Sequence, residues 1–234
     1  MTQPPPTRLN LGCGFDHRDG YLNVDFEPAH KPDLLADVRE LDGLEAGTYI
    51  EILAQDVLEH LTRDSAEPAL RRWNQLLDIG GTLTIRTTDV IGLCGMLAHH
   101  RDPKHQFELL QNLFGTQAYE GDYHLNGFTE SSLRAILHAT GFEVVSISRF
   151  DGWLLDCEAR KPEELGPLEL GPLPLMDMPT FGPDGLMIEP AEATPPDSTT
   201  GIDSLITRLG NRLPPTLAAP ARSARRWVLT RIGR

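Results

Sequence analysis

The sequence predicts an α/β fold built on a doubly wound, mostly parallel sheet of seven strands. Three observations support this prediction. Short apolar runs alternate with turn or helix signals along the first 90 residues, which is typical of parallel strands joined by crossovers. The first of these runs ends in the turn Gly12-Cys13-Gly14. The last two runs are joined by Asp151-Gly152, a hairpin signal, so one of them must run antiparallel to its neighbours.

Seven strands and two helices can be placed along the chain. The strands are expected at residues 8–12, 22–26, 33–37, 49–55, 82–87, 143–150 and 154–161. A helix over 65–79 places Leu70, Trp73 and Leu77 on one face, and Gly80-Gly81 is expected to end it. A second helix over 129–140 begins at Thr129, a favourable N-cap, and Gly141 suits the position after its last turn.

The first two crossovers of this sheet are unusually short. Only residues 15–21 separate Gly14 from Leu22, whereas a parallel crossover normally takes a dozen residues or more and contains a helix. Residues 27–32 form an equally short second connection. The first crossovers are therefore predicted to be abbreviated to turns.

Three regions of different composition follow one another along the chain. Residues 1–161 hold all the predicted strands, and residues 162–200 hold nine of the 19 prolines and many acids, which predicts a disordered or extended linker. Residues 201–234 carry seven arginines and one aspartate and are predicted to form a partly helical tail. Such a tail is suited to an acidic partner or an anionic membrane surface.

Charge and cysteine content limit the classes of function. The net charge of −13 argues against a nucleic-acid substrate, because phosphate contacts need a positive surface. Three cysteines are too few for a disulfide framework. Without a signal peptide or a run of 18 apolar residues, we expect a cytoplasmic protein, with peripheral membrane contact through the tail as the alternative.

The first two strands carry the features of a nucleoside site. Glycines at 12 and 14 allow the backbone to approach a ligand closely. Asp25 ends the second strand, where an acid can accept hydrogen bonds from both hydroxyls of a ribose. The third glycine of a dinucleotide fingerprint is missing, and no phosphate-binding loop exists. A nucleoside cofactor without phosphate, such as S-adenosylmethionine, suits these residues.

Four blocks of sequence extend this interpretation to a family. They are Leu9-Asn10-Leu11-Gly12-Cys13-Gly14 with Asn23-Val24-Asp25, then Ala36-Asp37-Val38, then Gln55-Asp56-Val57-Leu58-Glu59-His60-Leu61, and then Leu77-Asp78-Ile79-Gly80-Gly81. In order and spacing they resemble the class I S-adenosylmethionine-dependent methyltransferases, and most of all the sugar and natural-product O-methyltransferases. The resemblance covers roughly residues 8–161 and implies a Rossmann-like fold with a reversed final strand.

The resemblance implies a set of cofactor-binding residues. They are Asn10, Leu11, Gly12, Cys13, Gly14, Asp25, Asp37, Val38 and Gln55. Asp37 and Val38 would flank the adenine, and Gln55 would lie near the methionine end of the cofactor. Cys13 is expected to fill space with its side chain while its backbone faces the cofactor.

Three residues are candidates for catalysis. His124 lies in the segment 90–128, where this fold builds substrate caps, and an imidazole can take a hydroxyl proton near neutral pH. Asp56 and His60 follow the fourth strand, and His60 could act as a base or orient its loop. Asp56 and Asp89 are weak candidates for Mg²⁺, but two acids are fewer ligands than this cation takes, so independently hydrogen-bonded carboxylates are favoured.

The resemblance implies methyl transfer to a hydroxyl of a small molecule or sugar. Two alternatives remain open at this point. An N- or carboxyl-methyltransferase would use the same cofactor site, and a non-catalytic module would keep the fold as a cofactor-binding or scaffold domain.

Overall fold

The computed structural model describes residues 7–170, 180–181 and 187–188. The chain divides into two units, residues 1–170 and 171–234. Within the predicted linker, residues 162–170 contain no helix or strand, and β8 (Thr180–Phe181) pairs antiparallel with β9 (Met187–Ile188). The rest of the linker and the whole of the predicted tail lie outside the described residues. Among the helices that are described, none has the length and apolar character needed to cross a membrane.

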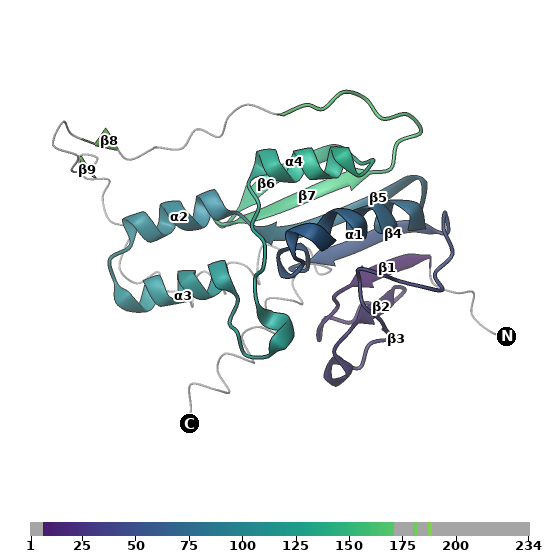
Figure 1. Ribbon diagram of the computed structural model, residues 1–234, viewed down its shortest axis with the longest axis horizontal. Helices are drawn as coiled ribbons and strands as arrows, with labels where there is room; N and C mark the ends of the chain where they lie inside the picture. The colour runs from purple at the N-terminus through teal and green to yellow at the C-terminus, as the bar shows by residue number, and fades with distance from the viewer. Residues whose placement is uncertain (1–6, 171–179, 182–186, 189–234) are drawn as a thin grey trace. The chain divides into compact units, whose positions relative to one another are not determined.

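The first unit is built on a seven-stranded sheet with the order β3-β2-β1-β4-β5-β7-β6 (Figure 1). Its strands are β1 (Arg8–Leu11), β2 (Leu22–Asp25), β3 (Leu34–Leu35), β4 (Tyr49–Gln55), β5 (Leu77–Thr88), β6 (Glu143–Phe150) and β7 (Leu154–Arg160). Only β7 runs antiparallel to its neighbours, and it lies between β5 and β6. The predicted fold class and the reversed strand are confirmed.

Four helices and three short 3-10 turns connect the strands. They are η1 (Pro28–His30), η2 (Leu58–His60), α1 (Arg63–Leu76), α2 (Val90–His99), α3 (Pro103–Phe114), η3 (Glu120–Asp122) and α4 (Glu130–Ala139). The predicted insertion 90–128 therefore holds two helices and a turn. No helix lies between β1 and β2, and η1 alone lies between β2 and β3, so the prediction of abbreviated crossovers is confirmed.

The predicted helix over 65–79 is wrong at its end. Helix α1 ends at Leu76, and residues 77–79 belong to β5. The reason is a contact with a distant segment. The backbone N–H groups of Gly47 and Thr48 donate to the carbonyls of Gln75 and Leu76 at 2.9 and 3.1 Å, and the helix ends there. Leu77 then pairs with Tyr49 at the edge of the β4–β5 ladder.

The apolar core lies on one face of the sheet, under α1 and α4. Alternation within the strands turns one set of side chains toward these helices. The set is Leu9 and Leu11 on β1, Ile52 and Ala54 on β4, Leu83 and Ile85 on β5, and Cys157 and Ala159 on β7. Trp73 of α1 and Leu133 and Leu137 of α4 are completely buried against them.

The opposite face is polar, and at β1 and β2 the loop 12–21 contacts it. The hydroxyl of Tyr21 donates to Glu51 of β4 at 2.7 Å, and the guanidinium of Arg18 donates to Gln55 at 2.9 Å. Asn10 and Asn23 face each other on this side and are buried. A short loop with polar side chains thus occupies the place where a crossover helix usually lies.

Candidate active site

The two glycines after β1 serve different purposes. Both have left-handed backbone, with φ of 60° at Gly12 and 51° at Gly14. A Cβ on Gly12 would come within 2.5 Å of Val57 Cγ2, so this glycine allows the turn to pack on the loop after β4. A Cβ on Gly14 would meet nothing within 4 Å. Gly14 therefore borders open space in which a ligand can approach the backbone.

Cys13 lies between these glycines with its side chain buried. Burial, together with the nearby carboxylate of Asp25, raises the pKa of its thiol to about 12. Its backbone N–H donates to the Val24 carbonyl at 3.0 Å and joins the turn to β2. This placement agrees with the expectation that the side chain of Cys13 fills space.

Asn10, which was predicted to bind cofactor, holds the loop in this structure. Its amide donates to the Asp16 carbonyl at 2.7 Å and to the Asn23 side chain at 3.0 Å. Asn23 in turn donates from its amide to Asp33 at 2.7 Å. Leu11 is completely buried in the core, so only its backbone could face a ligand. The roles of Asn23 and Asp33 were not predicted from the sequence.

Asp25 ends β2 directly beside the glycine turn. Its Oδ2 accepts from the backbone N–H of Gly14 at 2.8 Å, and its Oδ1 accepts from the N–H of Glu27 at 2.8 Å. The ring of His30 approaches from the loop, with Nδ1 3.2 Å from Oδ2. The predicted ribose acceptor thus lies beside the predicted turn, with an unpredicted histidine next to it.

Asp37 and Val38 lie in the loop after β3. The guanidinium of Arg39 donates to Asp37 at 2.9 Å and holds the pKa of its carboxyl below the usual range. Val38 is buried, and its carbonyl accepts from the indole N–H of Trp73 at 2.8 Å. These contacts fix the loop on α1. The predicted adenine contacts of this pair stay a prediction.

Gln55 and Asp56 lie where β4 ends. Gln55 accepts from Arg18, which is also bonded to Asp16 at 2.9 Å, so one arginine joins the glycine-turn loop to β4. Asp56 has an exposed side chain and a left-handed backbone with φ of 54°.

His60 and His124, predicted separately, lie together. Their rings meet edge to face with centroids 4.7 Å apart. The Nδ1 of His60 lies 3.1 Å from the carbonyl of Tyr123, which can only accept, so this nitrogen carries the proton and Nε2 keeps its lone pair. The Nδ1 of His124 is buried without a hydrogen-bond partner. Burial and the neighbouring His60 lower the pKa of His124 to about 4, and burial also lowers the pKa of His60.

Glu59 joins the two segments that carry these histidines. Its backbone carbonyl accepts from the N–H groups of Leu125 and Asn126 at 2.8 and 3.0 Å. Its carboxyl is buried and accepts from the hydroxyl of Thr87 at 2.9 Å. Burial, and after it Asp56, raises the pKa of this carboxyl. The turn after β4 therefore fixes the position of the loop that carries His124.

The carboxylate of Asp89 is bonded to other groups of the same chain. Its side chain is completely buried, caps α2 by accepting from the N–H of Ile91 at 3.1 Å, and pairs with the guanidinium of Arg149. Within the part of the chain that the structure describes, no three histidines, cysteines or acids gather in a way that could hold a metal ion. The structure therefore gives Asp89 a capping and ion-pairing role.

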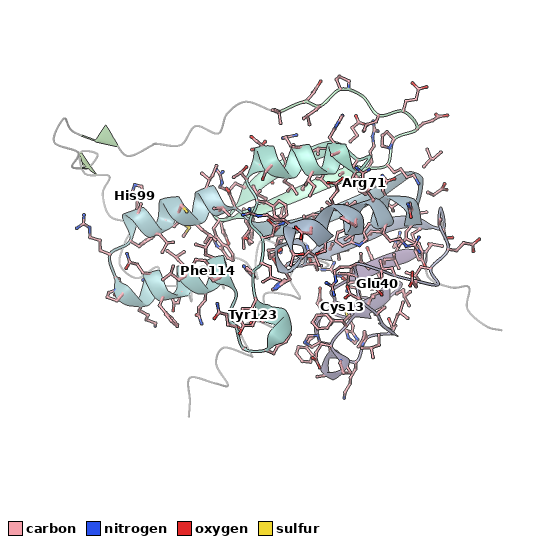
Figure 2. The ribbon with its side chains drawn as sticks, in the orientation of Figure 1. Cys13, Glu40, Arg71, His99, Phe114 and Tyr123 are labelled. Atoms are coloured by element: carbon pink, nitrogen blue, oxygen red, sulfur yellow. The ribbon has the colours of Figure 1, made fainter. Side chains whose placement is uncertain are left out.

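Exposed aromatic side chains from distant segments gather around Asp25. Phe15, Phe26 and Tyr119 are 63, 51 and 41% exposed. Phe15 meets the ring of His30 edge-on at 4.6 Å, and Tyr119 lies 6.2 Å from the same ring. Figure 2 shows Cys13 on the glycine turn and Tyr123 on the insertion at the same end of the sheet. The sequence contains no periodic signal that would have singled out these aromatic residues.

Comparisons with known proteins found similar solved structures only. No family model matches the chain, and no curated protein matches it. A possible exported protein of Bordetella parapertussis is 18% identical, with a TM-score of 0.48 over 68% of this chain and 62% of that one. The 1,6-didemethyltoxoflavin-N1-methyltransferase of Burkholderia thailandensis, solved with S-adenosylhomocysteine, is 21% identical, with a TM-score of 0.46 over 67 and 71%.

A third similar structure is an S-adenosylmethionine-dependent methyltransferase of Thermotoga maritima. It is 16% identical, with a TM-score of 0.45 over 68% of this chain and 83% of that one.

Proposed function

We propose that this chain is an S-adenosylmethionine-dependent methyltransferase that acts on a hydroxyl of a small molecule or sugar. The observation that carries the proposal is the meeting of three features at the carboxyl ends of β1, β2 and β4. They are the open space beside Gly14, the carboxylate of Asp25 bonded to that glycine, and the His60–His124 pair beside Glu59. Ligands of open α/β sheets bind at this edge.

The residues fit a nucleoside without phosphate. Asp25 would accept from ribose hydroxyls, and the exposed rings of Phe15 and Phe26 offer apolar surface for a base. Gly12, Cys13 and Gly14 would present backbone, and Gln55 would lie beside the amino-acid end. When bound, S-adenosylmethionine supplies a methyl group on a sulfonium, which is already a good leaving group.

The protein's own contribution to the reaction is alignment and removal of a proton. Holding two reactants in line contributes much of the rate enhancement in such a transfer. His124 is neutral at pH 7 because its pKa is lowered, so its ring has a lone pair that could take the proton of an acceptor hydroxyl. Its Nδ1 is buried, so the ring would have to turn toward the acceptor for this nitrogen to act as the base. His60 would orient His124 or share this role through its free Nε2.

A second candidate is methylation of an amine or a carboxylate. The low pKa of His124 favours it, because a base that weak is better suited to an acceptor that hardly needs one. The variant His124→Gln separates the two functions. Loss of transfer with intact S-adenosylhomocysteine binding supports a hydroxyl acceptor, and transfer that survives supports the amine or carboxylate.

The cofactor assignment is tested by thermal unfolding with S-adenosylhomocysteine. At about 100 times its Kd the ligand should stabilise the protein by about 2.7 kcal/mol. The variant Asp25→Ala should lose most of this effect, whereas the matched control Asp64→Ala, at an exposed position in α1, should keep it. No shift of the wild-type protein at millimolar ligand would contradict the assignment.

The acceptor is tested with labelled S-adenosylmethionine and a panel of glycans, phenols, amines and carboxylates. Label in a glycan or phenol product supports the proposed acceptor class. Binding of cofactor without transfer to any acceptor would favour a non-catalytic module.

A further inference from the structure

His30 occupies the place beside Asp25 that a ribose hydroxyl would need. Its Nδ1 lies 3.2 Å from Asp25 Oδ2, and only 13% of its side chain is exposed. No hydrogen bond of good geometry joins this nitrogen to Asp25 or to another group among the described residues. The contact is therefore weaker than a linear hydrogen bond.

The acceptor capacity of Asp25 makes this contact important. A carboxylate offers about four acceptor positions, two on each oxygen. The N–H of Gly14 takes one position on Oδ2, and the N–H of Glu27 takes one position on Oδ1. The ring of His30 lies against Oδ2 without a hydrogen bond and blocks access to its second position. One position therefore remains, whereas a ribose diol that donates from both hydroxyls needs two. The second becomes available only when the ring of His30 moves away.

The segment that carries His30 is short and locally held. It is the single turn η1, capped by the Glu27 side chain, which accepts from the N–H of Ala29 at 2.9 Å. The ring of His30 is held edge-on by Phe15 and Tyr119, and its carbonyl accepts from the ring of His17 at 2.9 Å. Moving the side chain breaks two aromatic contacts and one weak polar contact but no strand pairing.

We propose that His30 is a displaceable ligand of Asp25, which takes the position of a ribose hydroxyl in the free protein and gives it up when the nucleoside binds. This inference rests on the proposed function. It means that binding competes with an internal contact, so the apparent Kd is raised by the inverse of the fraction of molecules in which His30 has moved away.

The variant His30→Ala tests the proposal, because it removes the ring that lies against Asp25 together with its polar contact. Without ligand, the melting temperature should fall, since Asp25 loses a partner. In calorimetric titration, S-adenosylhomocysteine should bind several-fold more tightly than it does to wild type. The control His138→Ala, which alters a histidine of α4 that is bonded to the Gly166 carbonyl, should leave the affinity unchanged.

A lower melting temperature together with tighter binding would show that His30 competes with the nucleoside for Asp25. A purely structural role of His30 would instead lower both stability and affinity. Weaker or unchanged binding by His30→Ala would overturn the inference. If that variant fails to fold, the NMR chemical shifts of the His30 ring protons in the wild-type protein test the inference. Shifts that stay unchanged on saturation with S-adenosylhomocysteine would overturn the inference. Wild-type protein that does not bind this ligand overturns the proposed function as well.

Discussion

At the scale of single residues, Gly12 and Gly14 differ in what surrounds them although their backbones are alike. An alanine at 12 adds a clash with Val57 to the strain of a left-handed φ, whereas an alanine at 14 adds strain alone. We expect Gly12→Ala to lower the free energy of unfolding by about 2–4 kcal/mol and Gly14→Ala by about 1 kcal/mol.

The effects on ligand affinity should have the opposite order. Gly14→Ala should weaken binding of S-adenosylhomocysteine more than Gly12→Ala does, although it destabilises the protein less. The methyl group added by Gly14→Ala enters the open space proposed for the cofactor. This variant should therefore lose more affinity for S-adenosylhomocysteine than its small loss of stability would explain. Urea unfolding and calorimetric titration measure the two effects. Equal stability losses for both variants would contradict the packing role of Gly12.

The three cysteines should differ in reactivity. Burial raises the pKa of Cys13 and of Cys157 to about 12, while Cys94 on α2 is exposed. Because the thiolate is the reactive form, iodoacetamide at pH 8 should modify native protein at Cys94 and all three cysteines in denaturant. Intact-mass spectrometry counts the adducts, and Cys94→Ser should abolish the native one. Rapid labelling of Cys13 would show that the glycine turn opens.

His124 should make the protein less stable in acid. Its pKa is lowered to about 4 in the folded chain, whereas an unfolded histidine titrates near 6.5. As pH falls from about 6.5 toward about 4, the unfolded chain takes up a proton that the folded chain does not, so the free energy of unfolding decreases. Urea unfolding between pH 5 and 7 should show a shallower dependence for His124→Gln than for wild type or His138→Gln. Parallel curves would contradict a lowered pKa.

At the scale of elements, α4 is the helix whose ends are best defined by local sequence. Thr129 accepts from the N–H of Ser132 at 3.2 Å, and the Ser132 hydroxyl accepts from the N–H of Thr129 at 2.8 Å. At the other end Phe142 donates to the Leu137 carbonyl, and Gly141 has φ of 90°. Thr129→Ala should cost about 1 kcal/mol in urea unfolding. Ser131→Ala, at an exposed position of the same turn, is the control and should change stability little.

The elements that were predicted well are those with local signals. The ends of α4 and the Asp151-Gly152 hairpin could be predicted because their residues set the backbone themselves. The end of α1 could not be predicted, because its last carbonyls accept hydrogen bonds from Gly47 and Thr48, which lie in a distant segment of the sequence. Helix α2 has almost no polar residues to mark a face, so its sequence gives no helical period.

The site shows the same division. The positions of Asp25 and the glycine turn could be predicted, because each lies at the end of a strand and does not depend on how the loops fold. The pairing of His60 with His124 and the approach of His30 to Asp25 depend on how loops fold back. No spacing in the sequence encodes those contacts. The bonds from the Asn10 amide to Asp16 and Asn23 were not predicted, and cofactor binding by Asn10 stays a prediction.

At the scale of the whole molecule, the described sheet and its site should be independent of residues 171–234. The buried core lies between Leu9 and Ala159, and every candidate site residue lies between Asn10 and His124. A chain ending at Leu170 also keeps the bond from His138 to the Gly166 carbonyl. We expect it to fold and to bind S-adenosylhomocysteine with the Kd of the full chain, measured by calorimetry. Insolubility of the shortened chain would show that residues 171–234 contribute to the core.

The short loop after Gly14 also determines which nucleotides this edge of the sheet can hold. In a full crossover the glycine turn opens into a helix whose macrodipole places about half a positive charge beneath a bound phosphate. Here residues 15–21 contain no helix, so that charge is absent. Pyrophosphate cofactors and nucleoside triphosphates lose their main anchor, while a sulfonium loses nothing. We therefore expect phosphorylated nucleotides to bind this edge of the sheet only weakly, so they would not compete with the proposed cofactor.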